Sequence, residues 1–223
     1  YSQVELRILA HLCGGRGALA DAFARGADVH TETAASLLGI PAAEVDRDQR
    51  ALAKAVNFGI IYGQSAFGLA QTQRISRAEA AEYIARYKER FPEIEEYRQR
   101  TLAQARETGH VKTLLGRRRP VDLTTGSYVQ RSQAERVAVN APVQGSAADL
   151  IKQAMIAVDR RLREELPGQH LLLQVHDELI LEVDEDRAEA VGAMVREEMV
   201  GAMELDVPLV VDLGAGRSWD EAH

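Results

Sequence analysis

Residues 171–183 read LLLQVHDELILEV, and this stretch contributes most to the assignment of the fold class. Two apolar runs, 171–176 and 179–183, are separated only by Asp177 and Glu178, which is the spacing of a β-hairpin. Acidic side chains at its tip would be held rigidly by the strands, and such hard oxygen ligands suit Mg²⁺ or Mn²⁺. Adjacent strand residues point to opposite faces, so only one of the two is expected to be a primary metal ligand. The simpler alternative is a polar β-turn.

Around this hairpin the sequence pattern is mainly helical. Asp46 is placed to be the N-cap of a helix, and Ser76 followed by Glu79 forms a capping-box pattern. Pro142 predicts a kink or break inside the longest helical segment. The expected helices are 3–12, 18–25, 29–38, 47–61, 76–90, 92–108, 127–165 and 186–203, and the expected strands outside the hairpin are 111–115 and 208–213. The chain is therefore predicted to be α+β, with a small antiparallel sheet.

Composition narrows the class of protein. The chain has 223 residues, of which 46% are hydrophobic, so a globular protein is expected and global disorder is excluded. The single cysteine excludes a disulfide framework and a Cys-based zinc site within one chain, and it fits a reducing compartment. No apolar run approaches the roughly 18–20 residues of a membrane-spanning helix, and the first residues do not show the basic region followed by an apolar stretch that is typical of a signal peptide. The chain opens on Tyr1 without a methionine, which indicates a fragment of a longer protein.

The net charge of −7 argues at first against nucleic acid as a partner, because phosphate binding requires a basic surface. The charge is unevenly distributed, however. Residues 1–46 carry a net charge of −3, residues 47–160 carry +7 and residues 161–223 carry −11. A basic middle followed by an acidic end indicates a polyanion-binding region beside another function. The alternative is a set of solvated helix faces.

The predicted helix 47–61 carries two cations on one face. Arg50 and Lys54 lie four residues apart, so together they could grip a polyphosphate. Phe58 and Tyr62 have the same spacing and could present rings to a base or a sugar. The sequence contains no GxxxxGK[ST] pattern, so a P-loop is excluded as the phosphate-binding device. An ordinary surface helix remains the alternative.

Two further segments carry weaker signals. Three consecutive arginines at 117–119, with Lys112 nearby, are typical of a cluster that contacts a nucleic-acid backbone, although many surface loops carry such runs. Asn140 and Gln144, close to the expected kink, could hydrogen-bond bases or sugars, although such residues are more often caps and turn formers.

Taken together and in this order, the segments resemble the motifs of family A DNA polymerases, the bacterial DNA polymerase I type. Residues 1–7 (YSQVELR) resemble motif A without its leading Asp, residues 50–63 (RALAKAVNFGIIYG) resemble motif B on the O helix of the fingers, and residues 174–178 (QVHDE) resemble motif C. Further matching stretches are DVHTETA at 28–34, GRRR at 116–119, NAPVQGSAADLIK at 140–152 and GRSWDEA at 216–222. The resemblance covers essentially the whole chain.

The resemblance implies an α+β architecture of a polymerase palm, a small antiparallel sheet with helices, and mostly helical fingers. Residues 1–15 and 126–223 would form palm and residues 16–125 fingers, whereas the thumb and any exonuclease domain would be absent. The implied activity is template-dependent transfer of a dNTP to a primer 3′-OH by a two-metal mechanism that uses Mg²⁺, for which Mn²⁺ can substitute. The implied partners are primer–template DNA and dNTPs, with no membrane, in a bacterial cytoplasm or a phage-infected cell.

The resemblance also assigns roles to individual residues. Asp177 matches the motif C metal ligand and Glu178 its acidic neighbour, and the backbone of Tyr1 is the other expected metal contact. Arg50 and Lys54 match the residues that hold the triphosphate. The other residues implied to bind the nucleotide are His30 at the phosphate end, Phe58 at the sugar, Tyr62 near the template base, Glu5 as the block to a ribose 2′-OH, and Gln3 beside it. The residues implied to contact DNA are Arg117, Arg118, Arg136, Asn140, Gln144 and His176.

One departure from the family pattern limits the expected activity. The motif A Asp would sit immediately before Tyr1, and without it the two metals lose a shared ligand. The chain alone is therefore expected to be inactive or nearly so, and the missing N-terminal part of the polymerase is an expected partner. Asp177 should lie within about 15 Å of Tyr1, and Arg50 and Lys54 should face one cleft that closes when the O helix rotates.

Three other functions are compatible with parts of this pattern. A non-catalytic module that binds DNA or nucleotides would keep the basic block and need no metal. A metal-dependent nuclease would use His176, Asp177 and Glu178, but has no use for Arg50 and Lys54 on one helix. A single-subunit RNA polymerase is a nearer relative in fold, but Glu5 favours deoxynucleotides.

Overall fold

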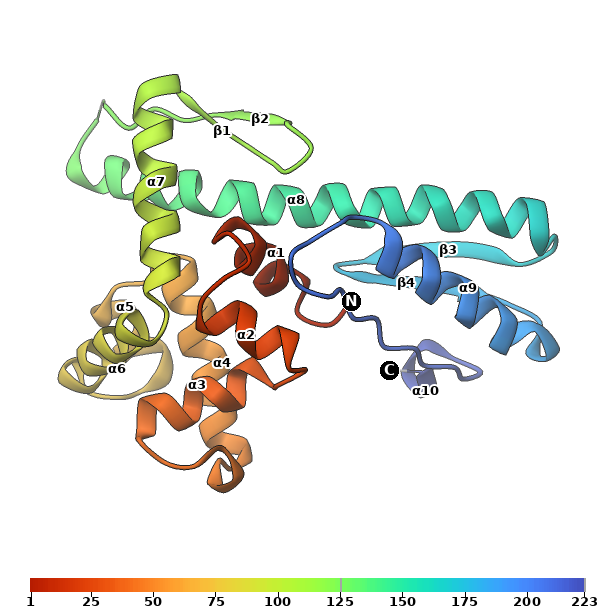
Figure 1. Ribbon diagram of the computed structural model, residues 1–223, viewed down its shortest axis with the longest axis horizontal. Helices are drawn as coiled ribbons and strands as arrows, with labels where there is room; N and C mark the ends of the chain where they lie inside the picture. Colours follow the sequence, from red (N-terminus) through yellow and green to blue (C-terminus); the bar gives the residue numbers. More distant parts are fainter. Residues whose placement is uncertain (125, 223) are drawn as a thin grey trace.

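The computed structural model describes residues 1–124 and 126–222, so residues 125 and 223, which end two of the expected domain ranges, lie outside the described part. Figure 1 shows a mostly helical molecule that is crossed by one long helix, α8, with a β-hairpin toward each end of it. The elements are α1 (Val4–Leu12), α2 (Ala18–Ala24), α3 (Val29–Leu38), η1 (Ala42–Glu44), α4 (Arg47–Ile61), α5 (Ala66–Gln73), α6 (Arg77–Arg90), α7 (Pro92–Thr108), β1 (His110–Lys112), β2 (Arg118–Pro120), α8 (Tyr128–Glu165), β3 (His170–Val175), β4 (Glu178–Glu182), η2 (Glu185–Arg187), α9 (Ala188–Gly201) and α10 (Trp219–Ala222). The predicted α+β class is confirmed.

Local capping signals place several helix ends correctly. Asp46 accepts a hydrogen bond from the Gln49 backbone at 2.8 Å, and the Gln49 side chain accepts one from the Asp46 backbone at 3.0 Å. Ser76 and Glu79 make the same reciprocal pair at the start of α6. Each pair satisfies backbone N–H groups that a helix leaves without partners. The predicted starts of α4 and α6 are therefore confirmed, and α7 ends as predicted before Gly109, whose φ is 71°.

Helix α8 corrects the prediction of a kink or break, because it runs as one helix of 38 residues through Pro142. The proline removes one backbone donor, but two side-chain hydroxyls bind carbonyls in this part of the helix. The Tyr97 hydroxyl donates to the Val139 carbonyl at 2.8 Å, and the Ser146 hydroxyl donates to the Pro142 carbonyl at 2.6 Å. Pro142 itself is buried, and α1 and α7 pack against this helix. Tertiary packing therefore outweighs the local helix-breaking tendency of proline.

The hairpin β3–β4 is antiparallel, as predicted, but its tip is shifted by one residue. Val175 pairs with Glu178, so His176 and Asp177 form the two-residue turn and Glu178 begins β4. The expected tip of Asp177 and Glu178 is thus wrong by one position. The reason is that His176 adopts φ 54°, a left-handed conformation that a sequence pattern does not predict for histidine.

Two other strand predictions need correction. The strand expected at 111–115 is observed as β1, one residue earlier and shorter, and it pairs with β2, which was not predicted. The strand expected at 208–213 is not formed in the described residues. Val207, Leu209 and Val211 are buried in alternation, which explains the strand-like pattern. The Ser2 backbone donates to the Val210 carbonyl at 2.9 Å, but no ladder develops there in the described part.

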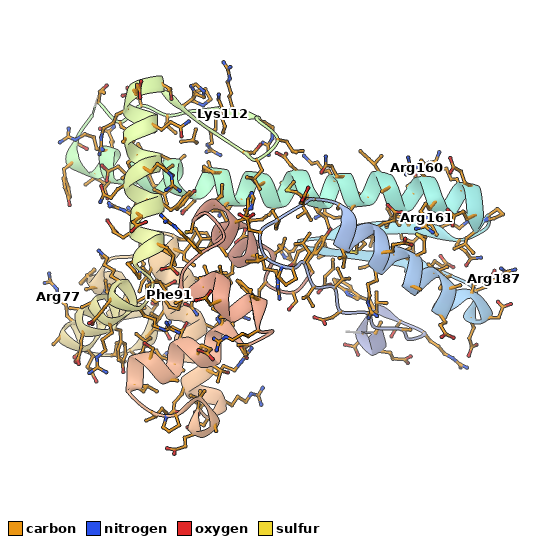
Figure 2. The ribbon with its side chains drawn as sticks, viewed as in Figure 1. Arg77, Phe91, Lys112, Arg160, Arg161 and Arg187 are labelled. Atoms are coloured by element: carbon orange, nitrogen blue, oxygen red, sulfur yellow. The ribbon has the colours of Figure 1, made fainter. Side chains whose placement is uncertain are left out.

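The helices α8 and α9 pack together at the acidic end of the molecule. Arg161 of α8 donates to Glu197 and Glu198 of α9 at 2.7 and 3.0 Å, and to Glu165 at 2.9 Å. Figure 2 shows Arg161 between the two helices, at the far end of α8 from Lys112. One guanidinium thus offsets part of the negative charge of residues 161–223.

The hydrophobic core places α1 at the centre of the molecule. Its residues Leu6, Ile8 and Leu9 are buried in the largest cluster, which also takes side chains from α2 to α7, α8 and the C-terminal segment. A second cluster joins α8 and α9 to the hairpin, and a third joins α7, β1 and α8. The buried Arg7 lies 4.4 Å over the Phe23 ring.

Arg7 also fixes the segment that precedes α1. Its Nε donates to the Ser2 carbonyl at 2.8 Å, and its terminal nitrogen donates to the Pro208 carbonyl at 2.5 Å. Burial lowers the pKa of Arg7, and Asp212 opposes that shift. The first residues of the chain are therefore tied to the C-terminal segment, beside the hairpin. Within the described residues, none of the helices combines the length and apolar character needed to cross a bilayer.

Candidate active site

The turn of the β3–β4 hairpin lies against the first residue of the chain. The Tyr1 amino group donates to the Asp177 carbonyl at 2.9 Å, across 176 positions of sequence. The Tyr1 hydroxyl donates to the Met199 carbonyl at 2.8 Å, and burial raises the pKa of that phenol. The predicted proximity of Tyr1 and Asp177 is confirmed.

The chemistry of the donors at this turn suits a hard cation. The Asp177 and Glu178 carboxylates and the Tyr1 carbonyl are all oxygen donors, the kind that Mg²⁺ takes. Asp177 and Glu178 are both half-buried, so each remains accessible to a ligand. Within 1–124 and 126–222, the structure gathers no group of three or more His, Cys, Asp or Glu side chains that could hold a metal. The residues present therefore fit part of a magnesium site, whose remaining ligands would be water and substrate phosphates or groups from outside this chain.

A second group of charged side chains surrounds the start of α3 and the first turns of α4. Arg50 Nε donates to Asp28 at 2.5 Å, and Asp28 caps α3 by accepting from the His30 and Thr31 backbones. Burial alone would raise the pKa of Asp28, but the Arg50 guanidinium and these N–H groups outweigh it and lower the pKa. Asp28 is thus ionised and holds Arg50 beside the start of α3.

His30 lies next to these charges and is itself buried, at 2% exposed. The pKa of His30 is lowered to about 4, mainly by burial; Asp28 raises the pKa, whereas Arg50 and Lys54 lower it. His30 is therefore neutral at pH 7. Both cations act on the same imidazole, so Arg50 and Lys54 lie in the neighbourhood of His30, and their facing one cleft stays a prediction.

Two buried polar side chains form a chain of hydrogen bonds that ends on the His30 ring. Asn57 Nδ2 lies 2.9 Å from His30 Nδ1, and Thr33 Oγ1 lies 3.2 Å from Asn57 Oδ1 and 2.7 Å from the Val29 carbonyl. Asn57 and Thr33 are 1% and 0% exposed. Neither was predicted as a site residue. Asn57 lies three residues after Lys54 on α4, which was the available signal, but its partner on α3 depends on how the helices pack.

The ring of His30 on α3 is followed by two aromatic rings on α4, which lie in succession toward the C-terminal end of α4. The centroids of His30 and Phe58 are 5.9 Å apart, and those of Phe58 and Tyr62 are 6.1 Å apart. The Tyr62 hydroxyl donates to Glu5 of α1 and also hydrogen-bonds Gln144 of α8. Burial, followed by the contact with Glu5, raises the pKa of Tyr62. Residues predicted from three separate motifs therefore meet at one point.

A cavity of about 290 Å³ opens beside Tyr62. Its lining includes Arg136, Asn140 and Gln144, three of the predicted DNA-contacting residues, together with Arg119, which was not among them. The run of three arginines was the available signal for Arg119. Asn140 Oδ1 is buried without a hydrogen-bond partner, as is Oε1 of the predicted site residue Gln3. These two oxygens are acceptors that a ligand or a water molecule can satisfy.

The other predicted DNA contacts lie elsewhere. Arg117 is engaged inside the chain: its Nε donates to Asp149 at 3.0 Å and its terminal nitrogen donates to the Gly145 carbonyl at 3.0 Å, which joins the β1–β2 hairpin to α8. Arg118 is exposed at the start of β2, and His176 is exposed in the β3–β4 turn. The structure thus gathers Arg136, Asn140 and Gln144 at the cavity. The other predicted DNA contacts, Arg117, Arg118 and His176, do not line it.

The fold and this site together indicate the class of a polymerase domain, with basic side chains at α4 and carboxylates at a hairpin turn. Residues 1–221 match the model of DNA polymerase family A, and the chain belongs to this family. It is 53% identical to DNA polymerase I of Pseudomonas aeruginosa and 52% identical to the thermostable DNA polymerase I of Thermus filiformis, in each case over 100% of this chain. It covers 24% and 26% of those proteins, about a quarter of their length.

A solved structure shows the same fold. The polymerase domain of Pol1 from M. smegmatis, in complex with DNA primer-template and dNTP, superposes with a TM-score of 0.95 at 45% identity. The match covers 100% of this chain and 39% of that one. The predicted resemblance to family A polymerases and the predicted fold are therefore confirmed.

Proposed function

We propose that this chain is part of a template-directed DNA polymerase, in which it supplies the nucleotide-binding helix, the motif C carboxylates and part of the primer–template surface. In this assignment residues 1–15 and 126–223 are palm and residues 16–125 are fingers. The observation that carries the proposal is the contact of Tyr1 with the Asp177 turn at 2.9 Å, because it joins motif A to motif C as a shared metal site requires.

The incoming dNTP would bind along α4. Arg50 and Lys54 face His30 from one helix and would hold the triphosphate by charge and hydrogen bonds. In the structure Arg50 pairs with Asp28 instead, so a triphosphate must compete with that carboxylate. Phe58 would lie against the sugar and Tyr62 near the template base.

Glu5 would exclude ribonucleotides from the same site. Its carboxylate accepts from Tyr62 and is half-buried at the first turn of α1, with Gln3 just before that helix. A carboxylate fixed in this way would occupy the space that a ribose 2′-OH needs. A deoxyribose has no 2′-OH and would not clash with the carboxylate.

The palm residues would hold magnesium and orient the primer end. Asp177 and Glu178, with the Tyr1 backbone, would contribute oxygen ligands. Mg²⁺ held by these residues would supply activation of the primer 3′-OH and stabilisation of the charge that develops on the α-phosphate. The turn itself positions Asp177, because the β3–β4 register and the Tyr1 contact fix it on both sides.

The DNA would be bound without sequence preference. Arg136, Asn140 and Gln144 line one cavity beside Tyr62, and His176 lies at the motif C turn. Arg118 is exposed on the β1–β2 hairpin and would contact phosphates. Arg117 would act mainly by holding that hairpin to α8, because Asp149 and the Gly145 carbonyl already engage it.

A chimera tests this function. Replacing the matching segment of the P. aeruginosa polymerase with this chain should give an enzyme that extends a primer with dNTPs and Mg²⁺. Asp177→Asn should reduce the extension rate by at least a hundredfold through the loss of a metal ligand. Asp186→Asn, at an exposed acid of η2, should leave the rate unchanged. Equal rates for the chimera and its Asp177→Asn variant would rule out the proposed role of motif C.

The 223-residue chain by itself is expected to bind dNTP without extending a primer, because its described residues gather too few carboxylates for the metal site. A binding titration and a primer-extension assay on the same sample separate the two properties. Processive synthesis by the chain alone would contradict this expectation. Binding of dNTP that survives Lys54→Ala would contradict the assignment of α4.

A further inference from the structure

The polar cluster of Thr33, Asn57 and His30 does more than fill space between α3 and α4. All three residues are 2% exposed or less, so the polar atoms at which they meet need partners inside the protein. In the structure Asn57 Nδ2 points at His30 Nδ1, 2.9 Å away. An amide NH₂ can only donate, so Nδ1 carries no proton and the neutral ring has its proton on Nε2.

The same cluster can also accommodate a protonated ring. A half-turn of the Asn57 amide exchanges its oxygen and nitrogen without moving other atoms. The oxygen then accepts from an Nδ1–H of His30, and the NH₂ donates to Thr33 Oγ1. The Thr33 hydroxyl proton goes to the Val29 carbonyl, which is 2.7 Å away. His30 Nδ1, the Asn57 amide and the Thr33 hydroxyl each keep a partner in this second arrangement.

Thr33 can hydrogen-bond the Asn57 amide in both arrangements. A hydroxyl both donates and accepts, so it can face either the oxygen or the nitrogen of the Asn57 amide. In the first arrangement it donates to Asn57 Oδ1, and in the second it accepts from Asn57 Nδ2. A purely apolar residue at position 33 would leave the amide one hydrogen bond short in both.

The charges around His30 decide which arrangement is occupied. Arg50 and Lys54 on α4 disfavour a second proton, Asp28 at the start of α3 favours it, and burial keeps the ring neutral. The cations that α2 and α6 bring to α3 are engaged elsewhere. Arg25 and Arg90 pair with Glu32 at 3.7 and 3.6 Å, and Arg86 donates to the Leu37 carbonyl while it pairs with Glu82. A polyanion between Arg50 and Lys54 would reverse the local potential at the ring.

We propose that Asn57 and Thr33 form a positioning pair that lets His30 gain a proton when a nucleoside triphosphate binds, by a half-turn of the Asn57 amide. This inference rests on the proposed function of α4. The proton comes from solvent, the new N–H bond forms at Nδ1, and the Nε2–H then faces the phosphates as part of a cation. Nucleotide binding is thereby coupled to uptake of a proton and strengthens as the pH falls.

Nitrogen NMR of the ring tests the proposal directly on the 223-residue chain. With ¹⁵N-labelled histidine at pH 6.5, His30 should show an unprotonated Nδ1 in the free chain and two protonated nitrogens in saturating dATP with Mg²⁺. A His30 ring that stays singly protonated in the bound state overturns the proposal. In a second sample with uniform ¹⁵N labelling, the absence of any dATP-induced shift of the Arg50 and Lys54 signals would show that the proposed function of α4 fails as well, so the two failures are distinguishable.

Calorimetry with variants provides a second readout. Titration of dATP in two buffers of different ionisation enthalpy gives the protons taken up, and His30→Gln corrects for the terminal phosphate, which titrates in the same range. The wild-type chain should take up more protons than His30→Gln. Asn57→Asp should match His30→Gln, because a carboxylate at position 57 keeps Nδ1 protonated before the nucleotide binds. Equal uptake by the wild-type chain and His30→Gln would overturn the proposal, as would wild-type uptake in a folded Asn57→Asp chain.

Discussion

At the scale of single residues, burial changes what a side chain can do. His30 lies beside two cations and is almost fully enclosed, so its proton affinity differs from that of an exposed histidine. The sequence predicted His30 as a phosphate-end residue from its motif. It could not predict the partners on its buried side, because Thr33 and Asn57 meet only when α3 packs on α4.

The low pKa of His30 predicts a pH dependence of stability. The unfolded ring titrates near 6.5, whereas in the folded chain burial lowers its pKa to about 4. The unfolded state therefore binds more protons in this window. The free energy of unfolding should fall as the pH drops from about 6.5 to about 4, with His30 contributing roughly 2–3 kcal/mol to the fall, and should not depend on His30 above it.

Urea denaturation at several pH values measures this contribution. His30→Gln should show a smaller loss of stability in acid than the wild-type chain, since the shared carboxylates affect both equally. His170→Gln, at an exposed position on β3, serves as the matched control and should follow the wild type. Parallel curves for the wild type and His30→Gln would show that the ring is not buried as a neutral group.

At the scale of secondary-structure elements, predictions succeeded where the signal is local. The capping boxes of α4 and α6 involve side chains three residues apart, so their geometry follows from the sequence alone. The segment 208–213 failed because alternating burial arises there without a neighbouring strand. The unbroken α8 was missed because the groups that bind carbonyls around Pro142 include Tyr97, which lies on another helix.

The junction after α4 gives a prediction at this scale. Gly63 has φ 75°, and a Cβ placed on it would lie 2.7 Å from Arg136 Cγ of α8. Gly39 has φ 70° but open space around it, so it isolates the cost of the backbone conformation. Gly39→Ala should cost about 1–2 kcal/mol of unfolding free energy, and Gly63→Ala should cost at least about 1 kcal/mol more because Arg136 must move.

A double-mutant cycle assigns the extra cost. Combining Gly63→Ala with Arg136→Ala should remove the additional penalty, which denaturation curves of the four proteins would show as a coupling energy. If Gly63→Ala and Gly39→Ala cost the same, the contact between the end of α4 and Arg136 does not constrain the junction.

At the scale of the whole molecule, the sequence charge pattern predicted where a polyanion would bind. The block 47–160, with its net charge of +7, contains α4 and the arginines around the cavity, whereas the block 161–223 places Arg161 among three acids. What the pattern could not provide is which arginines are already engaged, such as Arg117 on Asp149. That depends on contacts across the fold.

The salt dependence of DNA binding tests whether DNA binds to the basic block 47–160 and not to the acidic block 161–223. The affinity of the chain for a primer–template duplex of arbitrary sequence should fall steeply between about 50 and 200 mM salt. Arg136→Ala should reduce the slope of log affinity against log salt by about 0.9, as for one lost phosphate contact. Arg163→Ala, which removes a partner of Asp159 near the C-terminal end of α8, should leave the slope unchanged in fluorescence anisotropy. Identical slopes for all three proteins would contradict the assignment of Arg136.

The unbroken α8 has a mechanical consequence. At 1.5 Å per residue its 38 residues form a rod about 57 Å long, with Asn140 and Gln144 in its first half and the β3–β4 hairpin against its second half. A hinge at Pro142 would let the two halves swing independently, whereas a continuous helix moves as a lever. The number of residues in α8 therefore sets the distance between the cavity and Asp177. A one-residue deletion in the helix between them would shorten this distance and rotate one half of the helix relative to the other, because no bend is present to absorb the change.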